Sequence, residues 1–374
     1  MRAQLVNLVA AVRERPWLGW LGFLIVAVVS VLLPWTMGAS NQGVYVGMGL
    51  AVIVTVGLTM LVGFAGQISL GQAAFYLVGA YIAGILATHG FPTLLALALA
   101  PLGTALLAAV VGVPLLRLQG NYLAFATLAL QLILLALVLT QPALTGGEIG
   151  LLGFPPLTIG VPVTGAAFAA LVWFLAMLTL LLARNLIASR VGRGLQAIAA
   201  GESSAAAVGV PVAAYKLRVF VISAGMAGLA GGLYAFQNQY LSPDAFPILL
   251  SVEFLVMAAV GGLGSIPGAL VGAVAITLLQ NRLSDLGTVS GMPPNAPQIF
   301  SLGIFGLILV VVMLFFPRGL LPSAITFCRR LFGGWLALTV LAERGTATAG
   351  RLEGIISEKP VPAHSSGEGD DPTK

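Results

Sequence analysis

Charge is scarce in this chain: Asp, Glu, Lys and Arg make up 8% of its 374 residues, against about 25% in a typical soluble protein. Apolar residues make up 59%. This composition excludes an ordinary soluble domain and indicates an integral membrane protein. Because the apolar runs are continuous and do not alternate with polar residues, we expect membrane helices and not the strands of a barrel. The expected fold is an all-α polytopic membrane protein.

Cysteine and histidine are almost absent. Cys328 is the only cysteine, and His89 and His364 are the only histidines, so we expect neither an internal disulfide nor a histidine metal site. The Gly-Lys-Ser/Thr sequence of a phosphate-binding loop does not occur. No Ser–His grouping, Asp pair or His cluster indicates an intramembrane enzyme. We expect no catalytic residue, metal or cofactor in this chain, and a transporter driven by ATP would need its nucleotide site on another polypeptide.

Apolar runs of about 17 to 25 residues are long enough to cross a membrane as helices. The sequence contains about ten of them, which predicts about ten transmembrane helices. These runs cover residues 17–35, 43–62, 67–87, 92–114, 121–141, 161–183, 219–237, 249–264, 267–281 and 299–317.

Basic residues gather on one side of these ten segments. Cytoplasmic loops carry an excess of Lys and Arg, so that side is predicted to face the cytoplasm, as are both termini. The net charge of +5 reflects this bias, and we expect no nucleic-acid binding. The basic groups are Arg2, Arg13 and Arg15; Arg117; Arg184, Arg190, Arg193, Lys216 and Arg218; and Arg318, Arg329 and Arg330.

Three regions follow along the chain. Residues 1–16 form a cytoplasmic N-terminal segment, and residues 17–320 form the transmembrane domain, with a cytoplasmic loop at 184–218. The apolar run at 17–35 lacks a convincing cleavage site, so we interpret it as an uncleaved anchor. Residues 321–374 begin with a basic, amphipathic segment that suits the inner membrane surface. They end in a polar tail of disordered character.

Polar or small residues recur at every third or fourth position in the third, fifth and seventh predicted spans, which places them on one helix face. Buried amide and hydroxyl groups need partners, so these stripes predict a path for a solute. Close packing between helices is the alternative for each stripe. The candidate path residues are Ser69, Gln72 and Tyr76; Thr127 and Gln131; and Ser223 and Tyr234.

Glu253 is a carboxylate near the outer end of an apolar span. Such a residue must be neutralised, reach the interface or serve a function. We include it in the candidate path, and the alternative is a structural acid paired with backbone donors. The glycine-rich GGLGSIPG sequence at 261–268 follows it and is interpreted as a break between two spans.

The cytoplasmic loop contains the run IAAGESSAAAVGVP, too apolar for a solvated linker and too broken to span a membrane. A helix with Leu195 and Ile198 is expected to break at Gly201, restart at Glu202 and stop at Gly209. An exposed apolar face on this short element would need a partner. A connector that lies on the lipid surface is the alternative.

Several segments, in this order, resemble the M-type (LivM-like) permease subunits of branched-chain amino-acid ABC importers. The resemblance covers about residues 45–320 and implies half of a translocation path that opens alternately to the two sides. It places the ATPase-coupling loop at Glu202 and Gly209. The segments are GLTMLVGFAGQISLGQAAFYLVGAY, LRLQGNYLAFATLAL, LTGGEIGL, RVGRGLQAIAAGESSAAAVGV, YKLRVFVISAGMAGLAGGLYA and SVEFLVMAAVGGLGSIPGALVGA.

The resemblance also implies partners: an H-type permease subunit, two ABC ATPase subunits that bind ATP and Mg, and an extracytoplasmic solute-binding protein. The expected location is the plasma membrane of a prokaryote, which is the inner membrane in a Gram-negative cell. The chain departs from the family pattern at Gln72, where His is frequent, and at Ala199 to Gly201, where charged residues are frequent. Because related permeases carry urea or short amides, a urea or short-amide permease is one alternative. An ion-coupled secondary transporter is another.

Overall fold

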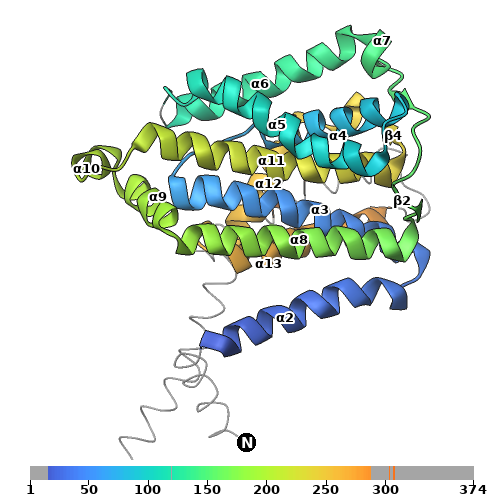
Figure 1. Cartoon of the computed structure of the whole chain (residues 1–374), viewed down its shortest axis with the longest axis horizontal. Coiled ribbons are helices and arrows are strands. Elements are labelled where there is room, and N and C mark those ends of the chain that lie inside the picture. The colour runs from blue at the N-terminus through green and yellow to red at the C-terminus, as the bar shows by residue number, and fades with distance from the viewer. Residues whose placement is uncertain (1–15, 119, 288–302, 304–305, 308–374) are drawn as a thin grey trace, which may run out of the picture. The chain divides into compact units, whose positions relative to one another are not determined.

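The computed structural model describes residues 16–118, 120–287, 303 and 306–307. The chain divides into two units, Met1–Ser323 and Ala324–Lys374, and all the described residues lie in the first (Figure 1). Its helices are α2 (Pro16–Leu32), α3 (Ala39–Thr59), α4 (Gln72–Thr88), α5 (Thr93–Leu115), α6 (Asn121–Thr140), α7 (Pro142–Thr145), α8 (Gly165–Ala188), α9 (Arg190–Ala200), α10 (Glu202–Ala207), α11 (Val212–Asn238), α12 (Ile248–Gly261) and α13 (Ile266–Gly287).

Short elements connect these helices. The 3₁₀ turns η1 (Leu33–Thr36) and η3 (Pro243–Ala245) precede α3 and α12, and a π-helical turn, η2 (Met60–Phe64), follows α3. Two antiparallel pairs of two-residue strands complete the fold. They are β1 (Leu151–Leu152) with β4 (Tyr240–Leu241), and β2 (Thr158–Ile159) with β3 (Val161–Pro162). The β1–β4 pair ties the connection after α7 to the end of α11.

The helical membrane fold is confirmed. Among the described residues, seven helices are long and apolar enough to cross a membrane, and two shorter apolar helices cover Leu21–Thr36 and Gln72–Thr88. Each of the first nine predicted segments overlaps a helix. The predicted tenth segment at 299–317 falls almost wholly outside the described residues, as do both termini and the segment 321–374.

One predicted boundary was wrong. The third segment does not become helical at Gln67, because the chain takes a left-handed turn at Gly66 (φ 67°) and α4 starts only at Gln72. The segment 184–218, predicted as a cytoplasmic loop, contains the end of α8, which continues to Ala188, and the start of α11 at Val212. Both long helices therefore extend beyond their apolar runs.

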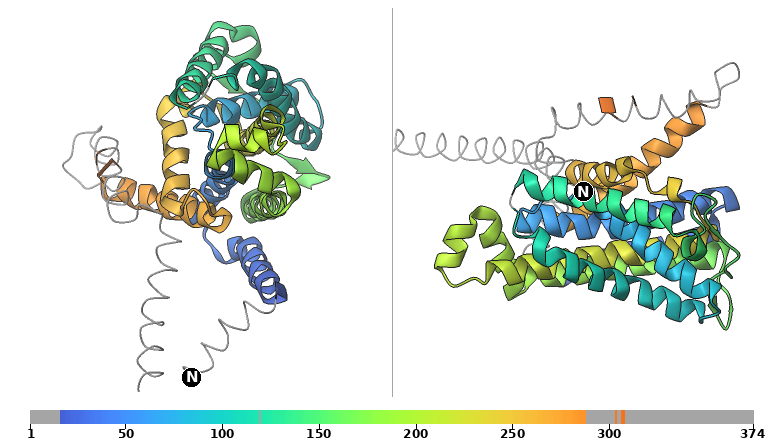
Figure 2. Two further views of the ribbon diagram at one scale, coloured as in Figure 1. Left: turned by 90° about the vertical axis from the view of Figure 1, so that its left-hand side faces the viewer. Right: turned by 90° about the horizontal axis from the view of Figure 1, so that it is seen from above.

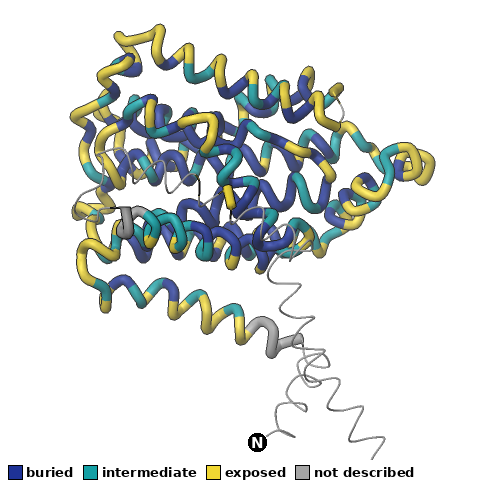
Figure 3. Tube along the Cα trace, turned by 180° about the vertical axis from the view of Figure 1, so that it is seen from behind, coloured by how far each residue is buried: buried dark blue, intermediate teal, exposed yellow. Residues whose placement is uncertain are grey.

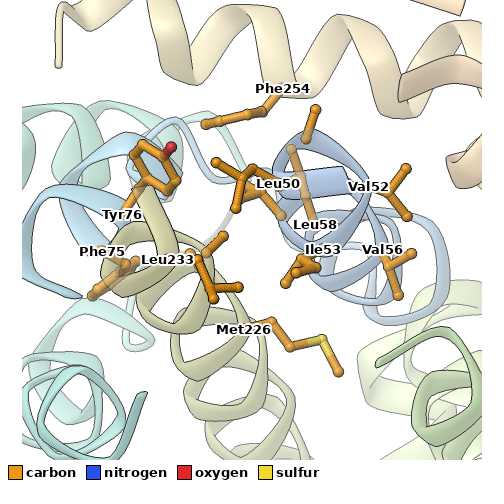
Figure 4. Close-up of a cluster of buried hydrophobic side chains, with 14 of the residues drawn as sticks. Leu50, Val52, Ile53, Val56, Leu58, Phe75, Tyr76, Met226, Leu233 and Phe254 are labelled. Carbon is orange, nitrogen blue, oxygen red and sulfur yellow. The ribbon is translucent and has the colours of Figure 1, made fainter. Parts of the chain in front are cut away.

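The centre of the fold is α3. In the most apolar stretch of α3, 83% of the residues are buried, whereas in α5 and in α6 the buried share is 28%. Figure 3 shows the buried trace in the middle and exposed residues along α6 and α2. On its two sides, α3 packs against α8 and α13 and against α11, and α11 packs further on α4 and α5 (Figures 1 and 2). Apolar side chains of α3, α4, α11 and α12 interdigitate in this core (Figure 4).

Glycine allows the closest helix crossing. A Cβ atom at Gly231 of α11 would lie 1.9 Å from the Tyr76 carbonyl oxygen, and one at Gly79 of α4 would lie 2.1 Å from the Gly228 carbonyl oxygen. Real Cβ atoms do not approach backbone so closely, so the α4–α11 crossing requires glycine at these positions. Such small-residue contacts are the usual way in which membrane helices pack without a hydrophobic driving force.

Candidate functional site

Polar side chains of four helices meet inside the membrane-spanning body, where α4 begins. Gln72, the first residue of α4, is 1% exposed. Its Nε2 donates a hydrogen bond to Ser223 Oγ of α11 at 2.8 Å. The hydroxyl of Thr127, on α6, accepts from the backbone N–H of Leu70 at 3.0 Å. The sequence places these groups on different helices, and the fold brings them together.

A second chain of hydrogen bonds joins α4, α6 and α12. Ser251 Oγ accepts from the N–H of Ala73 at 2.9 Å and donates to Gln131 Oε1 at 2.7 Å. Gln131 Nε2 in turn donates to the Pro247 carbonyl oxygen at 3.1 Å. This chain of bonds satisfies the Ala73 N–H at the start of α4, which has no intrahelical partner. It also holds the first turn of α12 against α6 through the Pro247 carbonyl oxygen and the Ser251 hydroxyl.

Aromatic rings gather one turn along α4 from Gln72. The ring of Tyr76 lies 5.5 Å from Tyr234, 5.6 Å from Phe246 and 5.9 Å from Phe254, centroid to centroid. Tyr81 lies 6.3 Å from Phe246. These separations and tilted geometries are typical of favourable aromatic contacts. We refer to Tyr76, Tyr81, Tyr234, Phe246 and Phe254 as the aromatic cluster.

The structure thus assembles most of the candidate path residues in one place, and it buries them against one another. Tyr234 is only partly buried. Ser69 is buried but does not continue the helical stripe, because it lies in the non-helical segment before α4, where its hydroxyl accepts from the Gly71 N–H. The buried members are Ser69, Gln72, Tyr76, Thr127, Gln131 and Ser223. Their contacts hold helices together in this conformation, and their role in solute passage stays a prediction.

Three residues of this region were missed in the sequence: Ser251, Phe246 and Phe254. Ser251 had a signal, since it is the one hydroxyl in the apolar run ILLSVEFLV. The two phenylalanines had none, because an aromatic residue in an apolar span is ordinary.

Glu253 lies on α12 and is half-buried. Its side chain hydrogen-bonds with Gln280 of α13. The carboxylate therefore stands apart from the aromatic cluster, although its sequence neighbour Phe254 belongs to it. The contact with Gln280 satisfies part of the hydrogen-bonding capacity of the carboxylate. This is consistent both with a residue at the edge of a solute path and with a structural acid.

The α9–α10 hairpin has the predicted break at Gly201 and the predicted stop at Gly209, whose φ is 83°. One expectation was wrong. Leu195 and Ile198 are 0% and 2% exposed, so they face the protein's own interior and do not form an exposed apolar face. The apolar residue that does project is Val208, 76% exposed.

One ion pair fastens this hairpin. Lys216, a buried residue near the start of α11, donates to the carboxylate of Glu202 at the start of α10. The hairpin projects beyond the ends of α8 and α11 (Figures 1 and 2). Its exposed end is therefore free of the membrane helices and is available to a partner.

The segment between α3 and α4 connects this hairpin to the polar residues. A Cβ atom at Gly66 would lie 3.5 Å from the Ala199 Cα atom of α9, and one at Gly71 would lie 2.8 Å from the Thr127 carbonyl oxygen of α6. A Cβ at Gly63 would lie 2.0 Å from the carbonyl oxygen of Leu263, in the turn between α12 and α13. Residues 60–71 thus lie against three separate parts of the fold: α9, α6 and the turn between α12 and α13.

A cavity of about 570 Å³ lies elsewhere, between α2, α8 and the start of α13. It is lined mainly by apolar side chains, and Arg184 is among its lining residues. None of the candidate path residues lines it. In the part of the chain that the structure describes, no three His, Cys, Asp or Glu side chains gather as metal ligands would.

Comparison with known proteins supports a transport role. Residues 41–313 match the family described as "Branched-chain amino acid transport system / permease component". The high-affinity branched-chain amino acid transport permease LivM of Salmonella typhimurium is 29% identical over 79% of this chain and 73% of its own length. The probable LivM of Methanocaldococcus jannaschii is 26% identical over 74% and 91%. The LivH permease of Salmonella typhimurium is 25% identical over 72% and 90%. No solved structure matches.

Proposed function

Because this chain belongs to the permease-component family of branched-chain amino acid transport systems, we propose that it forms half of the transmembrane path for a branched-chain or related amino acid. The chain is a permease subunit of an ABC importer and a multi-pass membrane protein of a prokaryote. The observation that supports the path best is the convergence of Gln72, Gln131 and Ser223 from three helices inside the membrane. Polar groups placed there are costly in lipid and typical of solute routes.

The complete transporter needs further subunits. Relatives of both the LivM and the LivH type imply a pair of permeases, and we propose that an H-type subunit supplies the other half of the path. Two ABC ATPase subunits would bind ATP and Mg and supply the energy, and an extracytoplasmic protein would deliver the solute. We place the assembly in the plasma membrane, the inner membrane of a Gram-negative cell.

The α9–α10 hairpin is the proposed contact with the ATPase. Glu202 and Gly209 lie at its projecting end, whereas Leu195 and Ile198 anchor α9 on the membrane helices. Closure of the ATPase on ATP would then move a firmly attached α9. Through the neighbouring Gly66, the motion would reach the start of α4.

Conformational change requires a differential affinity of ATP for the two states of the transporter. The Ser251 bridge to Ala73 and Gln131 is a suitable element to break, since each hydrogen bond contributes only about 1 kcal/mol net. Its loss would let α12 separate from α4 and α6. Glu253, which lies two residues after Ser251 on α12, is proposed to receive the ammonium group of the arriving solute.

The test is stimulated ATP hydrolysis by the purified complex, reconstituted in lipid with its binding protein. Leucine, isoleucine or valine should stimulate hydrolysis and accumulate inside the vesicles, whereas urea and acetamide should not. Stimulation by urea or acetamide alone would assign the chain to the amide permeases. Uptake that needs an ion gradient and no ATP would identify a secondary transporter and contradict the proposal.

A further inference from the structure

Two helices, α4 and α12, begin beside the middle of a third helix, α6. At 1.5 Å per residue, the 17 residues of α4 span about 25 Å, less than the roughly 30 Å of a hydrocarbon core. Their starts meet at Gln131, which lies at the middle of α6 and bonds to Pro247 and Ser251. The first turns of α4 and α12 therefore lie side by side at depth.

An unsatisfied amide group lies at this point. Gln72 uses its Nε2 on Ser223, but its Oε1 has no hydrogen-bond partner although the side chain is 1% exposed. A buried acceptor without a partner is destabilising, and functional sites are where such groups persist. Ser223 can accept or donate, so an amide flipped at Gln72 would leave an unpaired donor in its place. In either orientation, one polar position at the start of α4 awaits a partner.

The aromatic cluster begins one helical turn further along. Tyr76 follows Gln72 on the same face of α4, and Figure 4 shows its ring beside Phe254 of α12. The Tyr81 hydroxyl is also buried without a partner. Ring faces carry partial negative charge and attract ammonium groups, and the ring edges and Phe side chains offer an apolar surface.

We propose that Gln72 and the aromatic cluster form the central binding subsite for a zwitterionic amino acid. The Oε1 atom of Gln72 accepts a hydrogen bond from the solute's ammonium group, and the ring of Tyr76 faces the same cation. The adjoining starts of α4 and α12, where helix dipoles are positive, favour the carboxylate. The solute's apolar side chain packs among Tyr234, Phe246 and Phe254. This subsite rests on the proposed transport function.

The subsite divides between two bodies. Tyr76 and Tyr234 belong to α4 and α11, which the glycine crossing fixes together, whereas Phe246 and Phe254 belong to the chain leading into and along α12. The rings contact one another in this conformation, so a solute must part α12 from the α4–α11 pair. The bridge from Ser251 to Ala73 would open at the same step.

The experiment uses the complete complex in lipid vesicles with its binding protein, and measures leucine uptake and leucine-stimulated ATP hydrolysis side by side. Gln72→Leu removes the acceptor at similar volume and should lower leucine uptake about tenfold or more. Gln72→Glu keeps an acceptor and should retain more uptake than Gln72→Leu. Tyr76→Phe keeps the ring and should retain uptake, whereas Tyr76→Leu should lose it.

Thr179→Val is the matched control, since Thr179 is equally buried on α8 and bonds only to the carbonyl oxygen of Ala176. The proposed subsite would be overturned if the Gln72→Leu variant took up leucine at the wild-type rate. It would also be overturned if the Tyr76→Phe and Tyr76→Leu variants took up leucine equally well. Absence of any leucine uptake by the wild-type complex would instead overturn the proposed function, and with it the subsite.

A second measurement covers variants that do not assemble. The variant Tyr76→Cys in a Cys328→Ser background should react with a small water-soluble thiol reagent during turnover, since reaction needs water and thiolate. Leucine with its binding protein should slow this reaction, and urea should not. An unchanged reaction rate with leucine would contradict the proposal.

Discussion

The α4–α11 crossing and the α9–α10 hairpin are held in opposite ways. At the crossing, backbone rests on backbone: Cβ atoms at Gly79 and Gly231 would lie 2.1 Å and 1.9 Å from carbonyl oxygens. The hairpin is held by the side chains of Leu195 and Ile198 and by the Lys216–Glu202 ion pair. The crossing has no freedom to slide, whereas the end of the hairpin can move at small cost. An ATP-driven permease needs both a rigid set of helices and an element that can move when the ATPase changes conformation.

The starts of α4 and α12 are intermediate between these extremes. They are joined by hydrogen bonds of Ser251 and Gln131 and by ring contacts, which can break and form again. The difference suggests that the rigid frame consists of α3, α4 and α11, and that α12 is the part that moves.

The largest effect is expected at the crossing. Gly231→Ala should destabilise the protein by about 3 kcal/mol or more, because overpacking of this kind cannot be relieved by a side-chain movement. Gly225→Ala on the same helix is the control, since its Cβ would meet Pro101 at an ordinary 3.5 Å. Thermal unfolding of the purified protein measures both. Equal melting temperatures would contradict the rigid crossing.

Next comes the ion pair of the hairpin. Glu202→Lys leaves the buried Lys216 facing a second cation. Removing one partner of a buried ion pair can lower stability by about 3 to 5 kcal/mol. The loss should be smaller here because Glu202 is partly exposed. We expect ATP hydrolysis to lose its coupling to uptake while the protein still inserts. The double variant Glu202→Lys with Lys216→Glu, which swaps the two charges, should restore part of the coupling between ATP hydrolysis and uptake.

Gly209→Pro tests the same hairpin through the backbone. Gly209 has a φ of 83°, which proline, fixed near −65°, cannot adopt. We expect uptake to fall while the membrane helices remain intact, and co-purification of the ATPase reports the docking directly. Unchanged uptake and co-purification in both Glu202→Lys and Gly209→Pro would exclude the hairpin as the docking element.

A smaller effect is expected at the bridge between α4, α6 and α12. Ser251→Ala and Gln131→Leu should each change uptake several-fold, since single net hydrogen bonds contribute about 1 kcal/mol. Because both residues share one network, the double variant should cost less than the two single variants added. Strict additivity in uptake rates would show that the two residues act separately.

Glu253→Gln should have a modest, selective effect. The change keeps the shape and most hydrogen-bonding capacity of the side chain and removes its charge. An ion pair of a partly exposed carboxylate contributes about 0 to 1 kcal/mol, so amino-acid uptake should fall a few-fold. Transport of an uncharged amide, if it occurs, should be unaffected. Equal losses for both solutes would return Glu253 to a structural role beside Gln280.

The sequence could predict the helices because long apolar runs and basic flanks are local properties. It could not predict where α4 begins, since the residues from Gln67 to Gly71 look as helical as their neighbours. The left-handed turn at Gly66 and the contact of Gly71 with Thr127 decide that point.

The site was predictable in part for a related reason. Spacing on single helices identified Gln72, Gln131 and Ser223, but only the fold shows that these residues come together around the starts of α4 and α12. The same spacing misled on the hairpin. Leu195 and Ile198 mark a face of α9, and the sequence does not say whether that face meets a partner or the chain's own helices.

The smallest effect is expected on the membrane-facing side of α5. Leu106 is 68% exposed there, whereas Ala108, two residues later, is 0% exposed. If lipid covers Leu106, Leu106→Ala should change stability by less than about 0.5 kcal/mol, because lipid fills the space that the side chain leaves. Ala108→Leu, on the packed side, should cost about 1 to 3 kcal/mol. Thermal unfolding of the isolated subunit and of the whole complex distinguishes a face of α5 covered by lipid from one covered by the second permease.

If Leu106→Ala lowered the melting temperature of the complex alone, the second permease and not lipid would cover this face. The rigid frame of α3, α4 and α11 would then extend across the subunit boundary.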